Sequence, residues 1–160
     1  MNNKLKIEKI SNKNFEEFFY LLEKLALYEK LTPPNNEGRK RLKKDGLSKY
    51  PKYEAYIWRY EKKPIGYIIF FMTYSSFVTL PTFYLEDIFI LEEYRRKGIG
   101  QKMFQFCIKE AKKRGCGRVE FAVLNWNKSA IKFYKKNKAK PLSEWTYYRI
   151  TKDEIEKLVN

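Results

Sequence analysis

The chain has 160 residues, with 34 Lys and Arg against 19 Asp and Glu, which gives a formal net charge of +15. Its 13 Tyr, 12 Phe and 3 Trp argue against a disordered polycation and indicate one folded domain over residues 1–160. Histidine is absent, which excludes Ser-His-Asp and Cys-His catalysis and imidazole-ligated metals, so no metal site is expected.

Cysteine usage and the lack of targeting signals indicate the compartment. The two cysteines, Cys107 and Cys116, lack CxxC spacing and cannot form a disulfide framework. Residues 1–10 alternate Lys with apolar residues, unlike a signal peptide. The most apolar run, residues 65–72, is far shorter than the roughly 18 residues of a spanning helix. A reduced cytoplasmic protein without a membrane partner is expected.

The first half of the chain predicts two helices and four strands. Residues 5–10 alternate apolar with charged side chains, as in a half-buried strand. From Phe15 onward, apolar residues recur at three- and four-residue spacing, and Glu29 continues that stripe, so the helix would end in a carboxylate. Residues 37–47 are a short, basic helix candidate. Three antiparallel strands, rich in aromatic and β-branched residues, are predicted at 53–60, 64–74 and 82–91.

The second half predicts alternating strands and helices. Residues 101–114 carry a clear apolar stripe that closes before Gly115, in the manner of a helix C-terminus. A short strand is predicted at 119–124, and Asn127 is a candidate N-cap for a helix over 128–137. A last strand is predicted at 145–150, before a short terminal helix. An antiparallel meander followed by β-α-β-α-β predicts an α/β fold, with a central mixed sheet and helices on both faces.

Charge is distributed in blocks along the sequence. Residues 64–94 contain no Lys or Arg but four carboxylates, two of them at Glu86 and Asp87. Residues 95–140 contain 15 basic residues against two acidic ones. Buried strands exclude Lys and Arg, so packing alone can explain this pattern. The functional interpretation is a polyanionic ligand on the Arg95 side and an amine on the Glu86-Asp87 side.

A glycine-containing loop, Arg95-Arg96-Lys97-Gly98-Ile99-Gly100, lies between a predicted strand and the clearest predicted helix. Glycines let the backbone approach a phosphate, successive N–H groups form an anion-binding concavity, and the helix N-terminus adds a favourable dipole. The loop fits neither the Walker pattern nor the three-glycine dinucleotide fingerprint. Pyrophosphate binding and an ordinary strand-to-helix turn are the two interpretations.

Arg95, Gly98 and Gly100 match Gln/Arg-x-x-Gly-x-Gly/Ala, the acetyl-CoA signature of the GNAT superfamily of N-acetyltransferases, which this sequence resembles. The resemblance extends from the first predicted helix to the strand at 145–150. The segments that look like the diamine (spermidine/spermine) and thialysine acetyltransferase branch, in order and spacing, are residues 84–90, 93–95, 125–127 and 133–135.

The resemblance implies a binding role for several backbone segments. Backbone groups of Ile88-Phe89-Ile90 would hold the pantetheine arm of acetyl-CoA, the expected co-substrate, and the loop from Arg95 to Gly100 would hold its pyrophosphate. Within that loop Arg96, Lys97 and Ile99 are variable positions; the Arg96 and Lys97 side chains either contact phosphate or are merely solvated. Asn127 matches a position that contacts the co-substrate, although an N-cap explains it equally well.

The resemblance also implies catalytic roles. Tyr134 matches a tyrosine near the thioester sulfur that acts as general acid, and a phenol with a pKa of about 10 is protonated at neutral pH. Glu86 and Asp87 match an acidic pair at the amine site, where Glu86 is the candidate base and strand alternation would separate the two side chains. A structural carboxylate is the alternative. Glu29 would bind a second amine or merely end a helix.

The resemblance leaves the substrate open. Polyamine enzymes of this branch carry Asp-Pro-Trp after a Thr-Tyr pair, whereas this chain has Ser75-Ser76-Phe77 there, which favours a thialysine-like or other small primary amine. Direct acetyl transfer to a small amine is the expected activity, with a protein N-terminal or lysine acetyltransferase as the alternative. A basic nucleic-acid-binding module, for which no motif is present, and a noncatalytic acetyl-CoA sensor are alternatives of other classes. Family members are often homodimers, so a homodimer is a further expectation.

Overall fold

The computed structural model of the protein describes residues 4–159. These residues divide into two compact units, with the boundary between Ala122 and Val123. No helix in this part of the chain combines the length and apolarity that crossing a membrane requires. The elements are β1 (Leu5–Lys9), α1 (Phe15–Glu29), α2 (Asn36–Leu47), β2 (Glu54–Tyr60), β3 (Lys63–Ser75), β4 (Leu80–Ile90), η2 (Glu92–Tyr94), α3 (Ile99–Lys113), β5 (Arg118–Glu120), α4 (Lys128–Lys136) and α5 (Lys152–Leu158).

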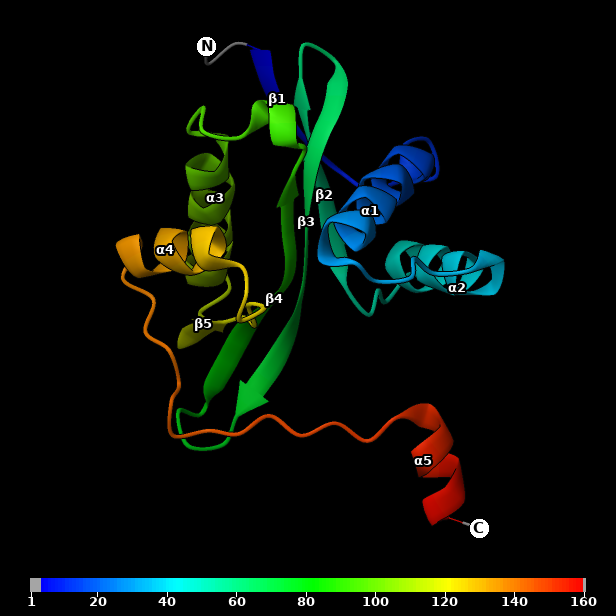
Figure 1. Cartoon of the computed structure of the whole chain (residues 1–160), viewed down its shortest axis with the longest axis vertical. Helices are drawn as coiled ribbons and strands as arrows, with labels where there is room; N and C mark the ends of the chain where they lie inside the picture. Colours follow the sequence, from blue (N-terminus) through cyan, green and yellow to red (C-terminus); the bar gives the residue numbers. More distant parts are fainter. Residues whose placement is uncertain (1–3, 160) are drawn as a thin grey trace. The chain divides into compact units, whose positions relative to one another are not determined.

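The first unit is built on a five-stranded mixed sheet with the order β1-β2-β3-β4-β5. Strands β2, β3 and β4 form the predicted antiparallel meander. In addition, β1 pairs antiparallel with β2, and β5 joins β4 in parallel. Helices α1 and α2 lie on one side of this sheet and α3 on the other (Figure 1). The predicted α/β class, mixed sheet and two helical faces are confirmed.

Aromatic side chains fill both interfaces between the sheet and the helices. On the α1 side, Phe15 and Phe18 are 0% exposed and pack with Tyr67 and Phe89 in one apolar cluster. On the α3 side, the ring of Phe106 packs edge-on against two rings of strand β2. The centroid distance is 5.0 Å to Tyr56 and 6.2 Å to Trp58. Each aromatic side chain buries a large apolar area, so these contacts fix both helices against the sheet.

A register shift interrupts the pairing of β3 with β4 at one position. Ile69 lies opposite Asp87, but the next residue of β3, Phe70, lies opposite Leu85. Glu86 is therefore an extra residue of β4 without a Cα partner in β3, as in a β-bulge. A bulge interrupts the regular alternation of side chains along a strand. Here Glu86 is exposed, whereas Asp87 is half-buried.

The predicted last strand is wrong. Residues 145–150 have no regular secondary structure, although their aromatic composition is typical of a strand. Trp145, Tyr147 and Tyr148 are 74%, 78% and 89% exposed. A strand needs a hydrogen-bonded neighbour, and no strand is assigned within residues 123–159 to provide one. The predicted strand at 119–124 is shorter than expected, whereas the terminal helix forms as α5, with a capping box between Thr151 and Glu154.

Candidate active site

Asp87 occupies the middle of β4, next to the bulge, and is half-buried. The hydroxyl of Tyr67, on β3, donates a hydrogen bond of 3.1 Å to Asp87 Oδ2. Burial raises the pKa of Asp87 to about 7, the Tyr67 hydrogen bond opposes that rise, and the negative charges of Glu86 and Glu29 add to it. A carboxyl group that gains and loses a proton near neutral pH is suited to general acid–base chemistry.

The other two carboxylates predicted to bind the acceptor amine, Glu86 and Glu29, belong to different elements, and their negative charges both raise the pKa of Asp87. Glu86 is exposed on β4, and Glu29 is the last residue of α1 and half-buried, so burial raises the pKa of Glu29. The end of α1 is fixed because Lys30 adopts a left-handed conformation and the Leu31 N–H donates to the Ala26 carbonyl, a Schellman-type cap. The structure thus brings Glu29 and Glu86 within electrostatic reach of Asp87.

The loop from Arg95 to Gly100 connects the 3-10 turn η2 to the start of α3. Arg96 and Gly98 both have positive φ, 58° and 75°, and Gly98 is the N-cap residue of α3. Left-handed residues in such a turn can direct neighbouring backbone N–H groups toward one side, as in an anion-binding nest, and a helix N-terminus adds further N–H groups. The local geometry therefore suits the pyrophosphate predicted for it.

Two side chains of the loop hold its shape. The Arg95 Nε donates to the Ile90 carbonyl at 2.9 Å, and its guanidinium lies 4.5 Å from the centroid of the Tyr28 ring on α1. Lys97 Nζ donates to the Glu93 carbonyl at 2.8 Å. Both side chains therefore contact the protein; Arg95 is half-buried, whereas Arg96 and Lys97 are exposed.

The two glycines of the loop differ in what the protein requires of them. Gly98 needs glycine for its positive φ. At Gly100 an added Cβ would meet only Ile90 Cδ1, at 3.5 Å, which is an ordinary contact. No packing within the described chain demands glycine at position 100.

The segment Ile88-Phe89-Ile90 lies in the part of β4 that does not pair with β5. The pairing of β4 with β5 runs only from Thr82 to Tyr84. Residues 88–90 are paired with β3 on one side and have no β5 partner on the other, within the residues described. The Ile90 carbonyl already accepts from Arg95 Nε. Other backbone groups on such a strand edge can bind an extended ligand by adding hydrogen bonds of the strand type, as the pantetheine arm would require.

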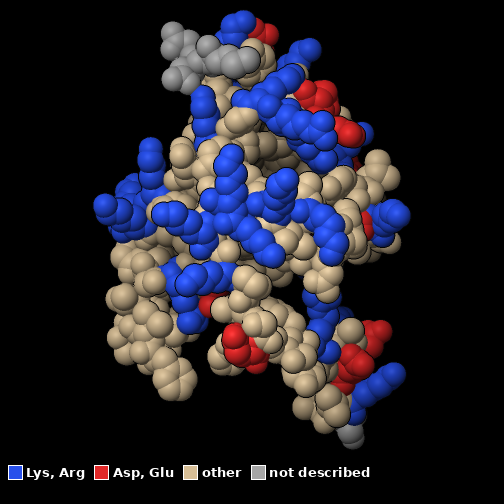
Figure 2. Space-filling view, turned by 60° about the vertical axis from the view of Figure 1, so that its left-hand side comes forward, with Lys and Arg blue, Asp and Glu red and all other residues tan. Residues whose placement is uncertain are grey.

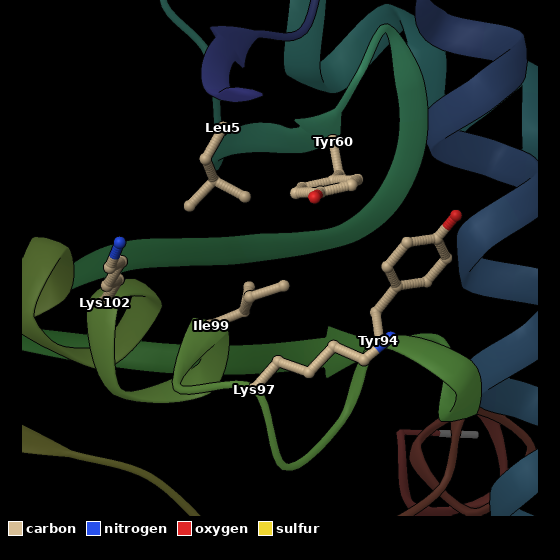
Figure 3. Close-up of a pocket in the computed structure, with 6 residues that line it drawn as sticks. All are labelled: Leu5, Tyr60, Tyr94, Lys97, Ile99 and Lys102. Atoms are coloured by element: carbon tan, nitrogen blue, oxygen red, sulfur yellow. The ribbon is translucent and has the colours of Figure 1, made fainter. Parts of the chain in front are cut away.

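A shallow hollow of about 130 Å³ lies beside the loop, on the flank of α3 that faces β1 and β2 (Figure 3). The rings of Tyr60 and Tyr94 and the side chain of Ile99 line it, with Leu5, Lys97 and Lys102. It contains none of the acceptor-side carboxylates. Lys and Arg side chains also gather on the face shown in Figure 2, and α3 alone carries four exposed lysines, Lys102, Lys109, Lys112 and Lys113. This positive charge favours a polyanionic ligand.

Asn127 and Tyr134 belong to the second unit, which is described by itself. The Asn127 side chain accepts a hydrogen bond of 3.1 Å from the Ala130 N–H, so its N-cap role is confirmed. Tyr134 is buried on α4, with its ring next to that of Phe133. Their roles toward co-substrate and thiolate stay predictions.

Sequence reasoning missed Tyr67, whose hydroxyl is the hydrogen-bond partner of Asp87. A signal was present, because Tyr67 carries the one side-chain polar group in the apolar run 65–71. A buried hydroxyl needs a partner, and the partner had to come from a neighbouring strand. In residues 4–159 no cluster of three or more Asp, Glu or Cys is arranged to hold a metal ion.

Solved structures resemble this fold closely. An integron cassette protein from V. cholerae aligns with a TM-score of 0.82 at 19% identity, covering 98% of each chain. An aminoglycoside N-acetyltransferase in complex with CoA aligns with a TM-score of 0.74 at 16% identity, covering 91% of this chain and 94% of that one. These likenesses support the fold assignment.

Sequence relatives are more specific. A thialysine N-epsilon-acetyltransferase of Bos taurus is 32% identical over 149 residues, covering 86% of this chain and 87% of the relative. An L-ornithine N5-acetyltransferase of Arabidopsis thaliana is 44% identical over 91 residues, a match that spans 57% of this chain and only 40% of that relative. Residues 17–138 match the acetyltransferase (GNAT) family. This chain belongs to that family and is an N-acetyltransferase.

Proposed function

We propose that the protein transfers an acetyl group from acetyl-CoA directly to a primary amine of a small molecule, either a diamine or a lysine-like amino acid. One observation carries the proposal. A half-buried carboxyl group, Asp87, with a pKa of about 7, lies on the same strand as residues 88–90, where β5 does not pair with β4. Amine acetylation requires a proton acceptor close to the thioester, and β4 supplies both positions.

The residues divide the work between the two substrates. Acetyl-CoA supplies an activated thioester. The loop from Arg95 to Gly100 binds its pyrophosphate through backbone N–H groups, and residues 88–90 bind the pantetheine arm along β4. Asn127 contributes a further contact. Tyr134 donates a proton to the departing thiolate, which a protonated phenol can do at neutral pH.

The acceptor amine binds beside the carboxylates of Asp87, Glu86 and Glu29. Asp87 takes the proton of the ammonium, whereas Glu86 and Glu29 attract its positive charge and that of a second cationic group. Asp87 fits the role of base better than Glu86, the residue favoured from the sequence, because Glu86 is exposed and unpaired in the sheet. The named relatives act on thialysine and ornithine, whose amino acid skeletons support a similar acceptor here.

A panel of acceptors tests this function. We expect thiol release from acetyl-CoA to be stimulated by one class among putrescine, spermidine, spermine, lysine, ornithine and thialysine, with acetylated amine as the product. Peptides with free N-termini or lysines serve as the comparison, because a protein acetyltransferase is the alternative. Stimulation by peptides alone would overturn the proposal, as would acetyl-CoA binding without turnover of any amine.

Substitution at Gly100 tests acetyl-CoA binding separately. Gly100→Val is expected to weaken acetyl-CoA binding at least about tenfold. The branched side chain would occupy the space in which the pyrophosphate has to approach the loop backbone. Gly100→Ala is the matched control, since the family signature accepts alanine there. Calorimetric titration gives the two affinities, and thermal melting shows whether both variants fold. Equal affinity of the valine and alanine variants would contradict the assignment of the loop.

We also propose the domain organisation, location and assembly of the protein. The chain is proposed to act as one N-acetyltransferase domain over residues 1–160, in the cytoplasm, as a homodimer and without a nucleic-acid partner. The exposed aromatic residues of the segment 145–150 support an interface there, because large exposed apolar groups mark interaction sites. Light scattering of the purified chain tests the dimer.

A further inference from the structure

Tyr67 and Asp87 form a polar pair inside an otherwise apolar interface. Tyr67 is 0% exposed, and its hydroxyl donates to Asp87 Oδ2 at 3.1 Å. Ile69 is the residue directly opposite Asp87, so Tyr67 is a diagonal neighbour two residues along the same face of β3. A phenylalanine at position 67 would fill the same apolar space. The hydroxyl is therefore explained by the carboxyl group and not by packing.

The ring that carries this hydroxyl is held on two sides. Phe18 of α1 meets it edge-on at a centroid distance of 5.2 Å, and Phe89 of β4 lies 6.1 Å away. Because packing fixes the ring, the Tyr67 hydroxyl also has a fixed position. A hydroxyl that orients the Asp87 carboxyl group must be fixed in this way.

We propose that Tyr67 is a positioning residue for amine acetylation: its hydroxyl orients the Asp87 carboxylate and favours its charged form, so that Oδ1 receives the proton of the acceptor ammonium. This inference rests on the proposed function. The proton of an N–H bond passes to Asp87 Oδ1, and the nitrogen lone pair forms the bond to the acetyl carbon. The carbon–sulfur bond breaks with its electron pair on sulfur, and the thiolate takes a proton from Tyr134. Solvent then restores the proton of Tyr134 and accepts both the proton on Asp87 and the second proton that the acylated nitrogen releases, so the ammonium loses two protons in all.

The charges around Asp87 show why a donor is needed. In the part of the chain described, Glu29 from α1 and Glu86 from β4 face Asp87 as negative charges, and burial also disfavours the carboxylate. Tyr67 from β3 acts in the opposite direction. Without its hydrogen bond the pKa of Asp87 would rise further, and less of the enzyme would hold the carboxylate at neutral pH.

The test is the pH dependence of kcat/KM in Tyr67→Phe. A hydrogen bond to a charged group contributes enough to move the acidic limb upward by about one to two pH units. We expect kcat/KM to fall about tenfold or more below neutral pH and to recover toward the wild-type value at high pH. Tyr53→Phe is the matched control, because the buried Tyr53 donates to the Leu42 carbonyl at 2.7 Å and does not contact Asp87. Its profile should coincide with that of the wild type.

A second measurement does not need an active enzyme. Carbon-13 NMR of aspartate-labelled protein gives the pKa of Asp87 directly in the wild type and in both variants. An upward shift in Tyr67→Phe alone supports the proposal, and an unchanged Asp87 pKa overturns it. An activity loss in Tyr67→Phe that is equal at every pH overturns it as well. If no amine is acetylated by the wild type, the proposed function fails, whereas the NMR titration still decides the action of Tyr67 on Asp87.

Discussion

Asp87→Asn is expected to lower kcat/KM for the acceptor amine by about 10² to 10⁴ and to make the folded protein more stable at pH 8. The loss of activity follows because an amide cannot take the proton of the ammonium. The gain in stability follows because the variant no longer holds a half-buried negative charge, while its amide oxygen still accepts the hydrogen bond from Tyr67.

The direction of the stability change follows from proton linkage. The pKa of Asp87 is raised from 3.8 in an unstructured chain to about 7 in the folded protein. Between these values the folded state binds more protons than the unfolded state, so the Asp87 contribution to stability falls as the pH rises from about 4 to about 7. At pH 8 the full penalty applies, on the order of 2 kcal/mol after allowance for the partial exposure of the residue.

Urea denaturation at pH 5 and pH 8 measures this effect. The advantage of Asp87→Asn should be larger at pH 8 than at pH 5. Glu86→Gln is the informative comparison, because Glu86 is exposed and its removal should raise KM more than it lowers kcat, with little change in stability. An Asp87→Asn variant that retains most of its activity, or that is less stable than the wild type at pH 8, would refute the role of Asp87 as base.

Tyr134→Phe is expected to lower kcat by about 10² or more while the affinity for acetyl-CoA changes little. Removal of the phenol leaves the thiolate without its proton donor, whereas the ring that packs on α4 is retained. Steady-state kinetics, with thermal melting to confirm folding, measure the effect. Tyr148→Phe is the control, because Tyr148 lies in the same unit and is 89% exposed. Equal kcat values for the two variants would remove Tyr134 from the mechanism.

Much of the fold could be predicted because its elements have strong local signals. The apolar stripe after Phe15 gives α1, and the stripe that ends before Gly115 gives α3. The aromatic and β-branched runs from 53 to 91 give the meander. The loop from Arg95 to Gly100 could be recognised because a glycine with positive φ at a helix start follows from residue type.

The features of the structure that could not be predicted from the sequence depend on partners that are distant in the sequence. Residues 145–150 have strand composition, but a strand exists only where a neighbour pairs with it, and composition does not reveal the neighbour. The bulge at Glu86 is a property of the register between two strands. For the same reason the sequence favours Glu86 as base, whereas the proposal of Asp87 depends on its hydrogen bond with Tyr67, which only the fold shows. Only the fold brings Tyr67 and Glu29 to Asp87.

The role of Asp87 as proton acceptor can be read from the pH profile of kcat/KM for the wild-type enzyme with the best acceptor of the panel. We expect an acidic limb with a midpoint of about 7, which reports the ionisation of Asp87 in the free enzyme. A profile that is flat through neutral pH, or one that follows only the ionisation of the amine at about pH 10, would contradict a carboxylate at Asp87 as the proton acceptor.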